Sequence, residues 1–378
     1  MKRWICLCLF LIWSGGISAQ WQSEVLCSPT RLNPQDNDRF HLGIDVTGFF
    51  KNNEYFSPIV KGETLPGVRF MPYVGYQLSD RFRMELGGYN IYYSGDQYKE
   101  GTYAFAGIHA KLQYAFTSET SLTIGNYRGG VNHRLIEPLY TWEKHLTERP
   151  ESGLQFRYEG ERHFADVWVN WQRFIQHGDS VPEVLTFGAS GELELGRKGR
   201  SRWSVPLQLL INHQGGQIDV SEERMIVAGN AAAGLIYQRD CPGRFPESWS
   251  MEVYLVGYYD KLPDNAVRPY ESGWGIYPVV RATERGFMAQ CGYWYAQQFY
   301  AFEGEPLFAS FNPLYPETTL PRRSMLTLKL SYEKQLHRLI GFGGFMETYS
   351  DFKRGKTDYC FGVYLRFKGN FSLQSVGY

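Results

Sequence analysis

Residues 326–333 read Leu-Thr-Leu-Lys-Leu-Ser-Tyr-Glu, a regular alternation of apolar and polar residues. Three Leu and one Tyr occupy one alternate set of positions, while Thr, Lys, Ser and Glu occupy the other. Successive side chains of an extended strand point to opposite faces, so this segment has one apolar face and one polar face. The pattern predicts a β-strand with one face in an apolar environment and the other in an aqueous one.

The same alternation recurs along the whole chain. Near the start, Phe40, Leu42, Ile44 and Val46 alternate with polar residues or glycine, and residues 361–367 repeat the pattern near the end. We predict sixteen strands, an even number, as in single-chain bacterial barrels. Their expected ranges are 39–50, 67–78, 81–94, 102–116, 120–128, 152–159, 162–175, 183–196, 202–213, 225–238, 248–260, 272–282, 285–297, 323–334, 338–350 and 357–368.

The predicted connections alternate in length. If the N-terminus is periplasmic, short connections such as 79–80 and 160–161 fall at the periplasmic end. Longer connections rich in Pro, Gly, Asn or charge, such as 51–66, 129–151 and 298–322, fall at the other end. Outer-membrane barrels have short periplasmic turns and longer external loops. The sequence therefore predicts an all-β fold, a transmembrane antiparallel up-and-down β-barrel of about 16 strands.

Two segments precede the predicted barrel, which we assign to residues 39–378. The first is basic at Lys2, continues with an apolar run and ends with small residues at Ala19, which is typical of a secretory signal peptide at 1–19. A membrane anchor is disfavoured because the apolar run has about ten residues, whereas a spanning helix needs about 20. Residues 20–38 would form a periplasmic N-terminal tail or a small hatch inside the lumen.

Composition narrows the class of protein. The chain has 27 Tyr, 25 Phe and 40 Gly, and past residue 19 it has no apolar stretch long enough for a membrane-spanning helix. Lys plus Arg and Asp plus Glu are both 39, so no charge excess points to nucleic acid. Cys27, Cys241, Cys291 and Cys360 match no metal motif, and their pairing cannot be deduced. We expect no cofactor.

A soluble β-sandwich or propeller is the competing structure, because it also contains alternating strands. Long strands, with Trp171 and Tyr259 near strand ends, favour a barrel with interfacial aromatic girdles. Pro72, Pro206 and Pro278 count against regular wall strands, because each proline removes a ladder donor. We therefore expect β-bulges at these three positions.

Together these features resemble the porin-like outer-membrane β-barrel proteins of Gram-negative bacteria, particularly those of the Bacteroides group. The last strand, Tyr359-Cys-Phe-Gly-Val-Tyr-Leu-Arg-Phe367, is part of that resemblance, which is one of pattern over the mature chain. Residues 368–378 continue past the aromatic at which such barrels often stop, so Tyr378 becomes the candidate assembly signal. The resemblance implies an outer-membrane location, contact with outer-membrane lipid and barrel-assembly machinery, and it leaves a homo-oligomer open.

A barrel of about 16 strands leaves an aqueous channel, so the predicted function is passive passage of small hydrophilic solutes. The predicted lumen row carries charges of both signs, which assigns no ion selectivity. The simpler interpretation is that these charges pair across the lumen wall. They are Arg69, Arg83, Lys111, Arg157, Lys329, Arg366, Lys368, Glu85, Glu159, Asp166, Glu192, Glu194, Glu252 and Glu333.

The connection between the fifth and sixth predicted strands is a candidate constriction. It contains His133, Arg134, Glu137, Tyr140 and Trp142. Folded into the lumen, it would let Arg134 and Glu137 set a transverse field, and Tyr140 and Trp142 would offer faces for sugar stacking. The alternative is a mobile external loop.

Enzymatic activity is not expected. His177, Asp179 and Ser180 lie close together, but catalytic triads are assembled from distant segments. His133 and His145 lack the spacing of metal ligands. The alternatives to a channel are a substrate-specific transporter or an envelope-assembly barrel without open-channel activity, and third an outer-membrane lipase or protease.

Overall fold

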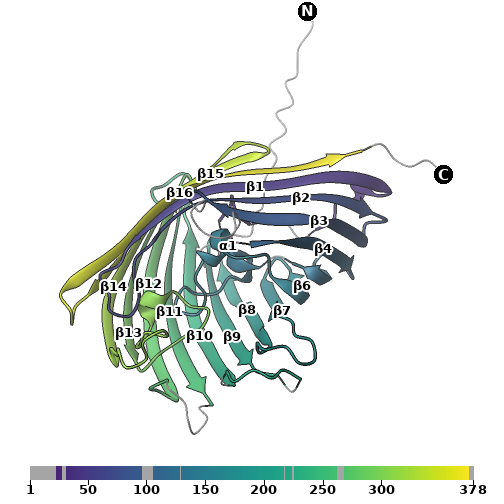
Figure 1. Cartoon of the computed structure of the whole chain (residues 1–378). Helices are drawn as coiled ribbons and strands as arrows, with labels where there is room; N and C mark the ends of the chain where they lie inside the picture. Colours follow the sequence, from purple (N-terminus) through teal and green to yellow (C-terminus); the bar gives the residue numbers. More distant parts are fainter. Residues whose placement is uncertain are drawn as a thin grey trace, which may run out of the picture.

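The computed structural model describes residues 23–27, 31–95, 105–127, 129–216, 218–223, 225–261 and 268–373. They form a closed antiparallel barrel of sixteen strands, in which each strand pairs with its sequence neighbours and β1 closes against β16 (Figure 1). The strands are β1 (Arg39–Glu54), β2 (Thr64–Gln77), β3 (Phe82–Tyr93), β4 (Phe105–Ala115), β5 (Thr120–Asn126), β6 (Ser152–Glu159), β7 (His163–Arg173), β8 (Val184–Lys198), β9 (Ser201–Gln214), β10 (Ile226–Asp240), β11 (Ser248–Asp260), β12 (Ser272–Glu284), β13 (Phe287–Gln297), β14 (Arg322–His337), β15 (Ile340–Asp351) and β16 (Lys356–Ser372). The predicted up-and-down barrel is confirmed.

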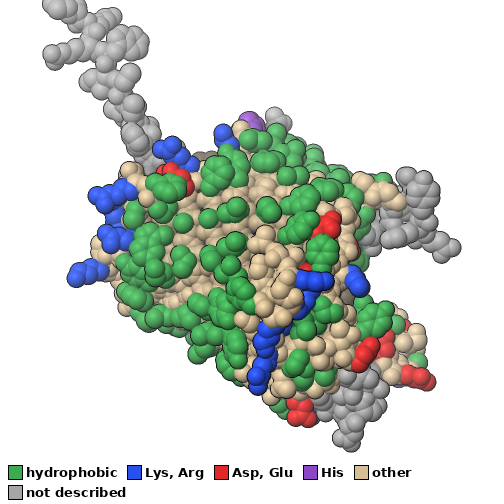
Figure 2. All heavy atoms as spheres, turned by 90° about the vertical axis from the view of Figure 1, so that its left-hand side faces the viewer, with side chains coloured by type: hydrophobic (Ala, Val, Ile, Leu, Met, Phe, Trp, Pro, Cys, Tyr) green, Lys and Arg blue, Asp and Glu red, His purple; other side chains and the backbone are tan. Residues whose placement is uncertain are grey.

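The outer surface of the barrel is apolar. On β14, Leu328 and Leu330 are exposed, while Thr327 and Lys329 are buried on the inner side. Figure 2 shows hydrophobic side chains spread over one face of the wall, with Lys and Arg side chains gathered at its left edge. Soluble proteins rarely expose so much contiguous apolar surface, so the wall is built to face lipid. The soluble alternative is excluded, because it would bury these side chains.

The two ends of the barrel differ as predicted. Short turns at one end include 78–81 between β2 and β3 and 285–286 between β12 and β13. The opposite end carries longer loops, including 55–63, 127–151 and 298–321. The short helices η3 (Gly130–His133), α1 (Lys144–Thr147) and η4 (Pro306–Phe308) belong to two of these loops, and η1 (Pro34–Asp36) precedes β1. No helix among the described residues is long and apolar enough to cross a membrane.

The bulges expected at Pro72, Pro206 and Pro278 are absent from the described strands, so that expectation is wrong. Each proline keeps its pairing with one neighbouring strand. Toward the other neighbour the ladder skips two residues and then resumes in the same register. A proline lacks only its own N–H, so the strand loses bonds on one side without inserting a residue. The recorded register shifts lie at Trp171/Arg173, Glu194/Gly196 and Gln335/His337.

Strand β16 is longer than predicted. It continues past Phe367, with Lys368 opposite Asp45 and Ser372 opposite His41 on β1, so part of the predicted tail is barrel wall. The predicted signal peptide and the candidate assembly signal Tyr378 lie outside the described residues.

Two loops fold into the lumen and fill much of it. Loop 127–151 carries η3 and α1, and Figure 1 shows α1 inside the ring of strands. Loop 298–321 buries Leu307, Phe308 and Phe311. The two loops are joined by backbone hydrogen bonds, in which Thr141 N donates to Glu303 O at 2.8 Å and Glu305 N donates to Glu137 O at 3.0 Å. The packed core of this barrel therefore lies inside the ring of strands.

Candidate functional site

His133 of η3 fixes loop 127–151 to the inner wall. Its Nδ1 lies 3.0 Å from Asp166 on β7 and its Nε2 lies 2.9 Å from Glu151, while its ring stacks on Trp168 at 3.5 Å between centroids. Burial opposes protonation, but the carboxylates of Glu151 and Asp166 outweigh it and raise the pKa of His133 to about 9. At neutral pH His133 is therefore a protonated imidazolium that forms ion pairs with Asp166 and Glu151, and it cannot act as a base there.

Arg134 and Glu137 contact different parts of the wall. The Arg134 Nη2 lies 2.7 Å from Glu159 at the end of β6, whereas the hydroxyl of Tyr349 on β15 donates to Glu137 at 3.2 Å. Burial and then the charge of Glu347 raise the pKa of Glu137 to about 7. The two side chains are not brought together, and their role in a constriction stays a prediction.

Tyr140 and Trp142 are buried by the packing of the loop. The Tyr140 hydroxyl donates to Glu151 at 2.7 Å, and the Trp142 Nε1 donates to Glu347 on β15 at 3.0 Å. Trp142 also packs edge-on against Phe345. Both hydrogen bonds satisfy the polar end of a buried aromatic ring, which is the usual arrangement in a protein core. A sugar could stack on these faces only if the loop moved.

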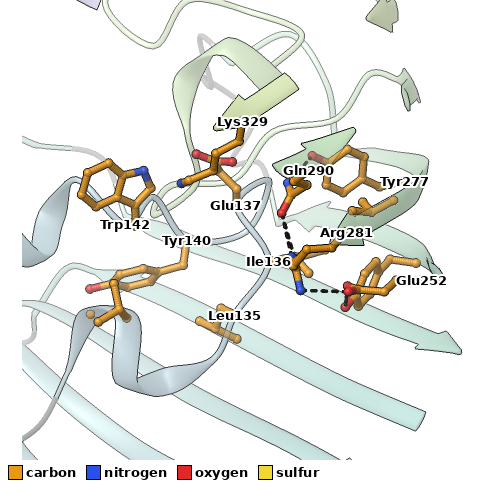
Figure 3. Close-up of a pocket in the computed structure, with 14 residues that line it drawn as sticks. Leu135, Ile136, Glu137, Tyr140, Trp142, Glu252, Tyr277, Arg281, Gln290 and Lys329 are labelled. Carbon is orange, nitrogen blue, oxygen red and sulfur yellow. Dashed lines mark hydrogen bonds and ion pairs between the residues drawn. The ribbon is translucent and has the colours of Figure 1, made fainter. Parts of the chain in front are cut away.

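A small central cavity lies between this loop and strands β11 to β14 (Figure 3). Its volume is about 60 Å³. Arg281 projects into it and donates to Glu252 at 2.8 Å and to Gln290 at 2.8 Å, as the dashed lines in Figure 3 show. This cavity has room for one or two water molecules, since each occupies about 30 Å³ in the liquid. It is too small to be a lipid-binding site.

Several other predicted lumen charges form ion pairs or hydrogen bonds along the wall. Lys329 pairs with Glu347 at 2.5 Å. Glu192 accepts a hydrogen bond from Ser204 at 2.8 Å, and Glu194 pairs with Arg197 at 2.7 Å. In these cases the partner lies nearby on the wall, as the simpler interpretation of the sequence expected.

Glu333 and Arg366 hold the N-terminal segment 23–27 against the inner wall. The Glu333 carboxylate accepts hydrogen bonds from the Ser23 hydroxyl and, at 2.7 Å, from the backbone N–H of Glu24. The Arg366 Nη1 donates to the carbonyl oxygen of Val25 at 2.8 Å and to that of Leu26 at 2.6 Å. Two oppositely charged wall side chains thus bind the backbone of this segment.

Replacing Glu333 with Ala should release the segment. A hydrogen bond to a charged group stabilises by about 1.5–3 kcal/mol, so amide hydrogen exchange at Glu24 and Val25 should accelerate by about tenfold or more. Hydrogen exchange read by mass spectrometry measures this. Glu194→Ala, which also removes an inner-wall carboxylate but does not touch the segment, is the control. Unchanged exchange in Glu333→Ala would contradict the assignment.

A larger cavity, of about 140 Å³, lies between strands β1 to β4 and loop 127–151. We call it the β1–β4 cavity. Its wall side chains include Arg69, Tyr73, Glu85, His109 and Lys111, and the loop contributes residues on both sides of η3 and around α1. Two histidines and ten acidic or basic side chains line it. This concentration of titratable groups beside a cavity marks it as the candidate functional site.

His109 and Glu85 form the distinctive pair of this cavity. His109 Nε2 lies 3.3 Å from Glu85 Oε2, and Glu85 also pairs with Arg83 at 2.8 Å and with Lys111 at 3.5 Å. The two cations stabilise the ionised carboxylate, which can only accept a hydrogen bond, so Nε2 carries the proton. In the neutral form of the imidazole, Nδ1 is then the nitrogen with the lone pair.

The Nδ1 atom of His109 is buried and has no hydrogen-bond partner among the described residues. The residue itself is 4 % exposed. Leaving such an atom unpaired costs about 1–3 kcal/mol, so stability alone does not explain the arrangement. An imidazole oriented by a carboxylate, with its second nitrogen unbonded, has the form of a general base.

Arg69 and His145 complete the cavity on the loop side. Arg69 Nη1 donates to the carbonyl oxygen of His145 at 2.7 Å. Burial and then the charge of Arg69 lower the pKa of His145 to about 3, so its imidazole is neutral at physiological pH. Among the described residues, no group of three or more His, Cys, Asp or Glu side chains is placed to hold a metal ion.

The sequence pattern predicts Arg83, Glu85 and Lys111 on the inner row, but it does not single out His109 as a site residue. The available signal was its position two residues before Lys111, in the same row of the same strand. What was missing was the register of β3 against β4, which places Glu85 opposite Lys111 and next to His109. Register depends on the pairing of two strands, so one strand's sequence does not fix it.

The comparisons with solved structures concern the fold. The chain is similar to the outer membrane protein OprD from Pseudomonas aeruginosa, at 8% identity and a TM-score of 0.52, covering 93% of this chain and 98% of that one. Acinetobacter baumannii OccAB4 follows at 9% identity and a TM-score of 0.49, covering 90% and 100%. At such identities the likeness shows the fold alone, and the prediction of a porin-like outer-membrane barrel is confirmed at that level. No curated protein matches.

A family model described as lipid A 3'-O-deacylase-type matches residues 32–376. This match overturns the expectation that the chain is not an enzyme, because the family is named for the cleavage of an ester. The expectation failed because it relied on local motifs, and the pair His109 and Glu85 lies on two separate strands that only the folded wall brings together.

Proposed function

Because the chain belongs to the lipid A 3'-O-deacylase-type family, we propose that it hydrolyses an acyl ester of a lipid A-type glycolipid in the outer membrane. The observation that carries the proposal is the pair His109 and Glu85 beside the β1–β4 cavity, 3.3 Å apart, with Nδ1 of the imidazole unpaired. A base oriented by a carboxylate in this way can activate water for ester hydrolysis.

Water is the nucleophile in this proposal, because no Ser or Cys is among the described residues that line the cavity and the hydrogen-bond partner of His109 is Glu85, not the hydroxyl of Thr47. His109 Nδ1 accepts a proton from a water molecule while the water oxygen attacks the ester carbonyl carbon. Collapse of the tetrahedral intermediate breaks the bond between that carbon and the alkoxy oxygen. The imidazolium returns its proton to the alkoxide, which gives one fatty acid and one sugar hydroxyl. No other reactant is needed.

The tetrahedral intermediate carries a negative charge on the former carbonyl oxygen. Arg69 and Lys111 line the same cavity and can stabilise that oxyanion. Preorganised cations stabilise such an oxyanion strongly wherever a site excludes the water that would screen them. Glu85 holds the imidazolium formed in the first step, as a carboxylate does in a hydrolytic triad.

Mass spectrometry of lipid A tests the proposal. Lipid A extracted from Gram-negative cells that express the chain should lose one ester-linked acyl chain, and free fatty acid should appear in equal amount. Purified barrel in detergent, mixed with lipopolysaccharide, should give the same products. Unchanged lipid A in both experiments, with the barrel correctly folded, would overturn the proposal.

Passage of small hydrophilic solutes is the second candidate. Its support is the polar inner wall and the fold that the chain shares with OprD. The two loops in the lumen leave the cavities of about 60 and 140 Å³ described above, so we expect slow or no permeation unless the loops move. Liposome swelling with sugars of graded size measures this. Rapid swelling with disaccharides would favour the channel.

A further inference from the structure

Two adjacent strands of the barrel wall are shorter than their neighbours. β5 has 7 residues and β6 has 8. A strand that crosses the bilayer needs about 9–11 residues at the usual tilt. The neighbours β4 and β7 have 11 residues each. β5 and β6 are thus the shortest strands of the described wall, and their backbone pairing ends at Tyr127 and Glu151.

The missing part of the wall lies at the long-loop end. β4 pairs with β5 only from Lys111 to Ala115, so residues 105–109 have no β5 partner among the described residues. On the other side, β6 begins at Ser152, whereas β7 continues to Arg173. We call the gap bounded by residues 105–109, Asn126, Ser152 and residues 171–173 the wall notch.

Two glycines explain why the wall stops there. Gly125 on β5 faces Gly153 on β6, and their φ angles are +90° and +147°. A Cβ on Gly125 would lie 2.2 Å from the carbonyl oxygen of Ala110, and one on Gly153 would lie 2.2 Å from that of Val169. Only glycine tolerates both the dihedral angle and the close approach. Just beyond these glycines the chain leaves the wall and enters the lumen.

The outer border of the wall notch is apolar. Ile108 is 73 % exposed, and Ile124 and Leu154 are 50 % and 45 % exposed. All three side chains belong to the lipid-facing row of their strands. A hydrocarbon chain at this border would stay in contact with apolar side chains.

The wall notch lies next to the β1–β4 cavity, because the two share residues. Asn126, Tyr127 and residues 148–151 border the notch and also line the cavity. Arg149 lies over the ring of Phe105, 5.3 Å from its centroid, at the first described residue of β4. Six basic side chains line the cavity against four acidic ones. The cavity therefore complements an anionic group such as a phosphate.

We propose that the wall notch is the lateral entrance through which an acyl chain of an anionic glycolipid passes from the outer leaflet to the β1–β4 cavity. The chain lies against Ile108 and Leu154, and the headgroup phosphate lies beside Arg149. The proposal rests on the proposed function, since it says how the ester reaches His109. A path through the extracellular mouth would carry the acyl chain through water, and each exposed methylene makes that path less favourable.

Photocrosslinking tests the entrance without relying on activity. A photoreactive benzoylphenylalanine replaces Phe105, an aromatic residue beside the notch, in the full-length protein carrying His109→Ala so that the lipid is not consumed. The matched control places the same group at Phe302, a partly buried aromatic residue of loop 298–321. The probe is radiolabelled lipid A in phospholipid vesicles, with phosphate-free lipid A in a parallel set.

We expect labelling at position 105 to exceed labelling at position 302 by tenfold or more, and to fall several-fold with phosphate-free lipid A. Arg149→Ala should remove most of that phosphate dependence. Equal labelling at both positions, or none at position 105, would overturn the entrance. Labelling at position 105 without any hydrolysis by wild-type protein would refute only the proposed function, and hydrolysis without labelling would refute only the entrance.

Discussion

Replacing His109 with Asn is expected to lower the rate of acyl-ester hydrolysis by about 10²- to 10⁴-fold, the contribution that a positioned general base makes. The imidazole is the only group in the cavity that combines a carboxylate partner with a buried, unpaired nitrogen among the described residues. Asn keeps a polar side chain of similar size but cannot accept the proton of water. Fatty-acid release from lipopolysaccharide, measured against folded protein, gives the rate.

His41→Asn is the matched control for this variant. His41 also lies on the inner row and is fully buried. It lies near the start of β1, at the short-turn end, and does not line the β1–β4 cavity. Its replacement should leave the rate within about twofold, because distant substitutions are usually independent. An equal loss in both variants would indicate a general structural effect and would remove His109 from the mechanism.

The Glu85→Gln variant keeps the proposed base, His109, but removes the carboxylate that orients its imidazole. The amide can donate as well as accept, so it no longer fixes the proton on Nε2. We expect a loss in kcat comparable with that of His109→Asn and little change in KM, since Glu85 holds the imidazole but does not remove the proton itself. If KM alone changed, the carboxylate would act in binding and the assigned role would be wrong.

Replacing His133 with Ala is expected to destabilise the attachment of loop 127–151 by about 3 to 5 kcal/mol, the cost of breaking a buried ion pair by removing one partner. The imidazolium lies between Asp166 and Glu151, at 3.0 and 2.9 Å, and both carboxylates would face each other without it. The stacking on Trp168 would also be lost. Thermal unfolding and single-channel conductance measure the effect, and we expect a lower Tm and a larger conductance.

His145→Ala is the stability control, because His145 lies in the same loop and its ring makes no hydrogen bond with the described residues. It should lower the Tm much less than His133→Ala does. Equal Tm values for the two variants would show that the two carboxylates do not hold the loop through His133.

The stability that His133 provides should depend on pH in a defined direction. The folded-state pKa of about 9 lies above the ordinary value of 6.5, so the contribution is complete below about pH 6.5 and is lost as the pH rises through about 9. The pKa of Glu151 is lowered, because the charge of His133 outweighs burial, to about 2, so its contribution is lost only as the pH falls toward that value. The Tm difference between wild type and His133→Ala should therefore shrink between pH 7 and pH 10. A Tm difference that stays constant over this pH range would contradict the ion pairs assigned to His133.

Much of the wall could be predicted because its signal is local. The alternation in residues 326–333 needs no partner strand to be recognised, and most strand bounds follow from it within a few residues. The prolines show the limit of this reasoning. Pro72 removes a donor wherever it lies, but whether the ladder bulges or only skips depends on the neighbouring strand, which the residue itself does not reveal.

The site was harder to predict because its parts are distant in sequence. His133 and Arg134 are adjacent, yet the first contacts Asp166 on β7 and the second contacts Glu159 on β6. The charged loop was visible as a candidate for the lumen, but its partners were not. Glu303, a residue of another loop, accepts a hydrogen bond from Thr141, and no spacing rule connects them.

The alternation of apolar and polar residues was enough to predict a lipid-facing barrel of sixteen antiparallel strands, since an alternating apolar row is a property of each strand taken alone. The closed barrel was needed to show that His109 and Glu85 meet, that loop 127–151 enters the lumen, and that the chain leaves the wall just beyond Gly125 and just before Gly153. These outcomes depend on strand register and on contacts between distant segments, and such contacts exist only once the barrel has closed.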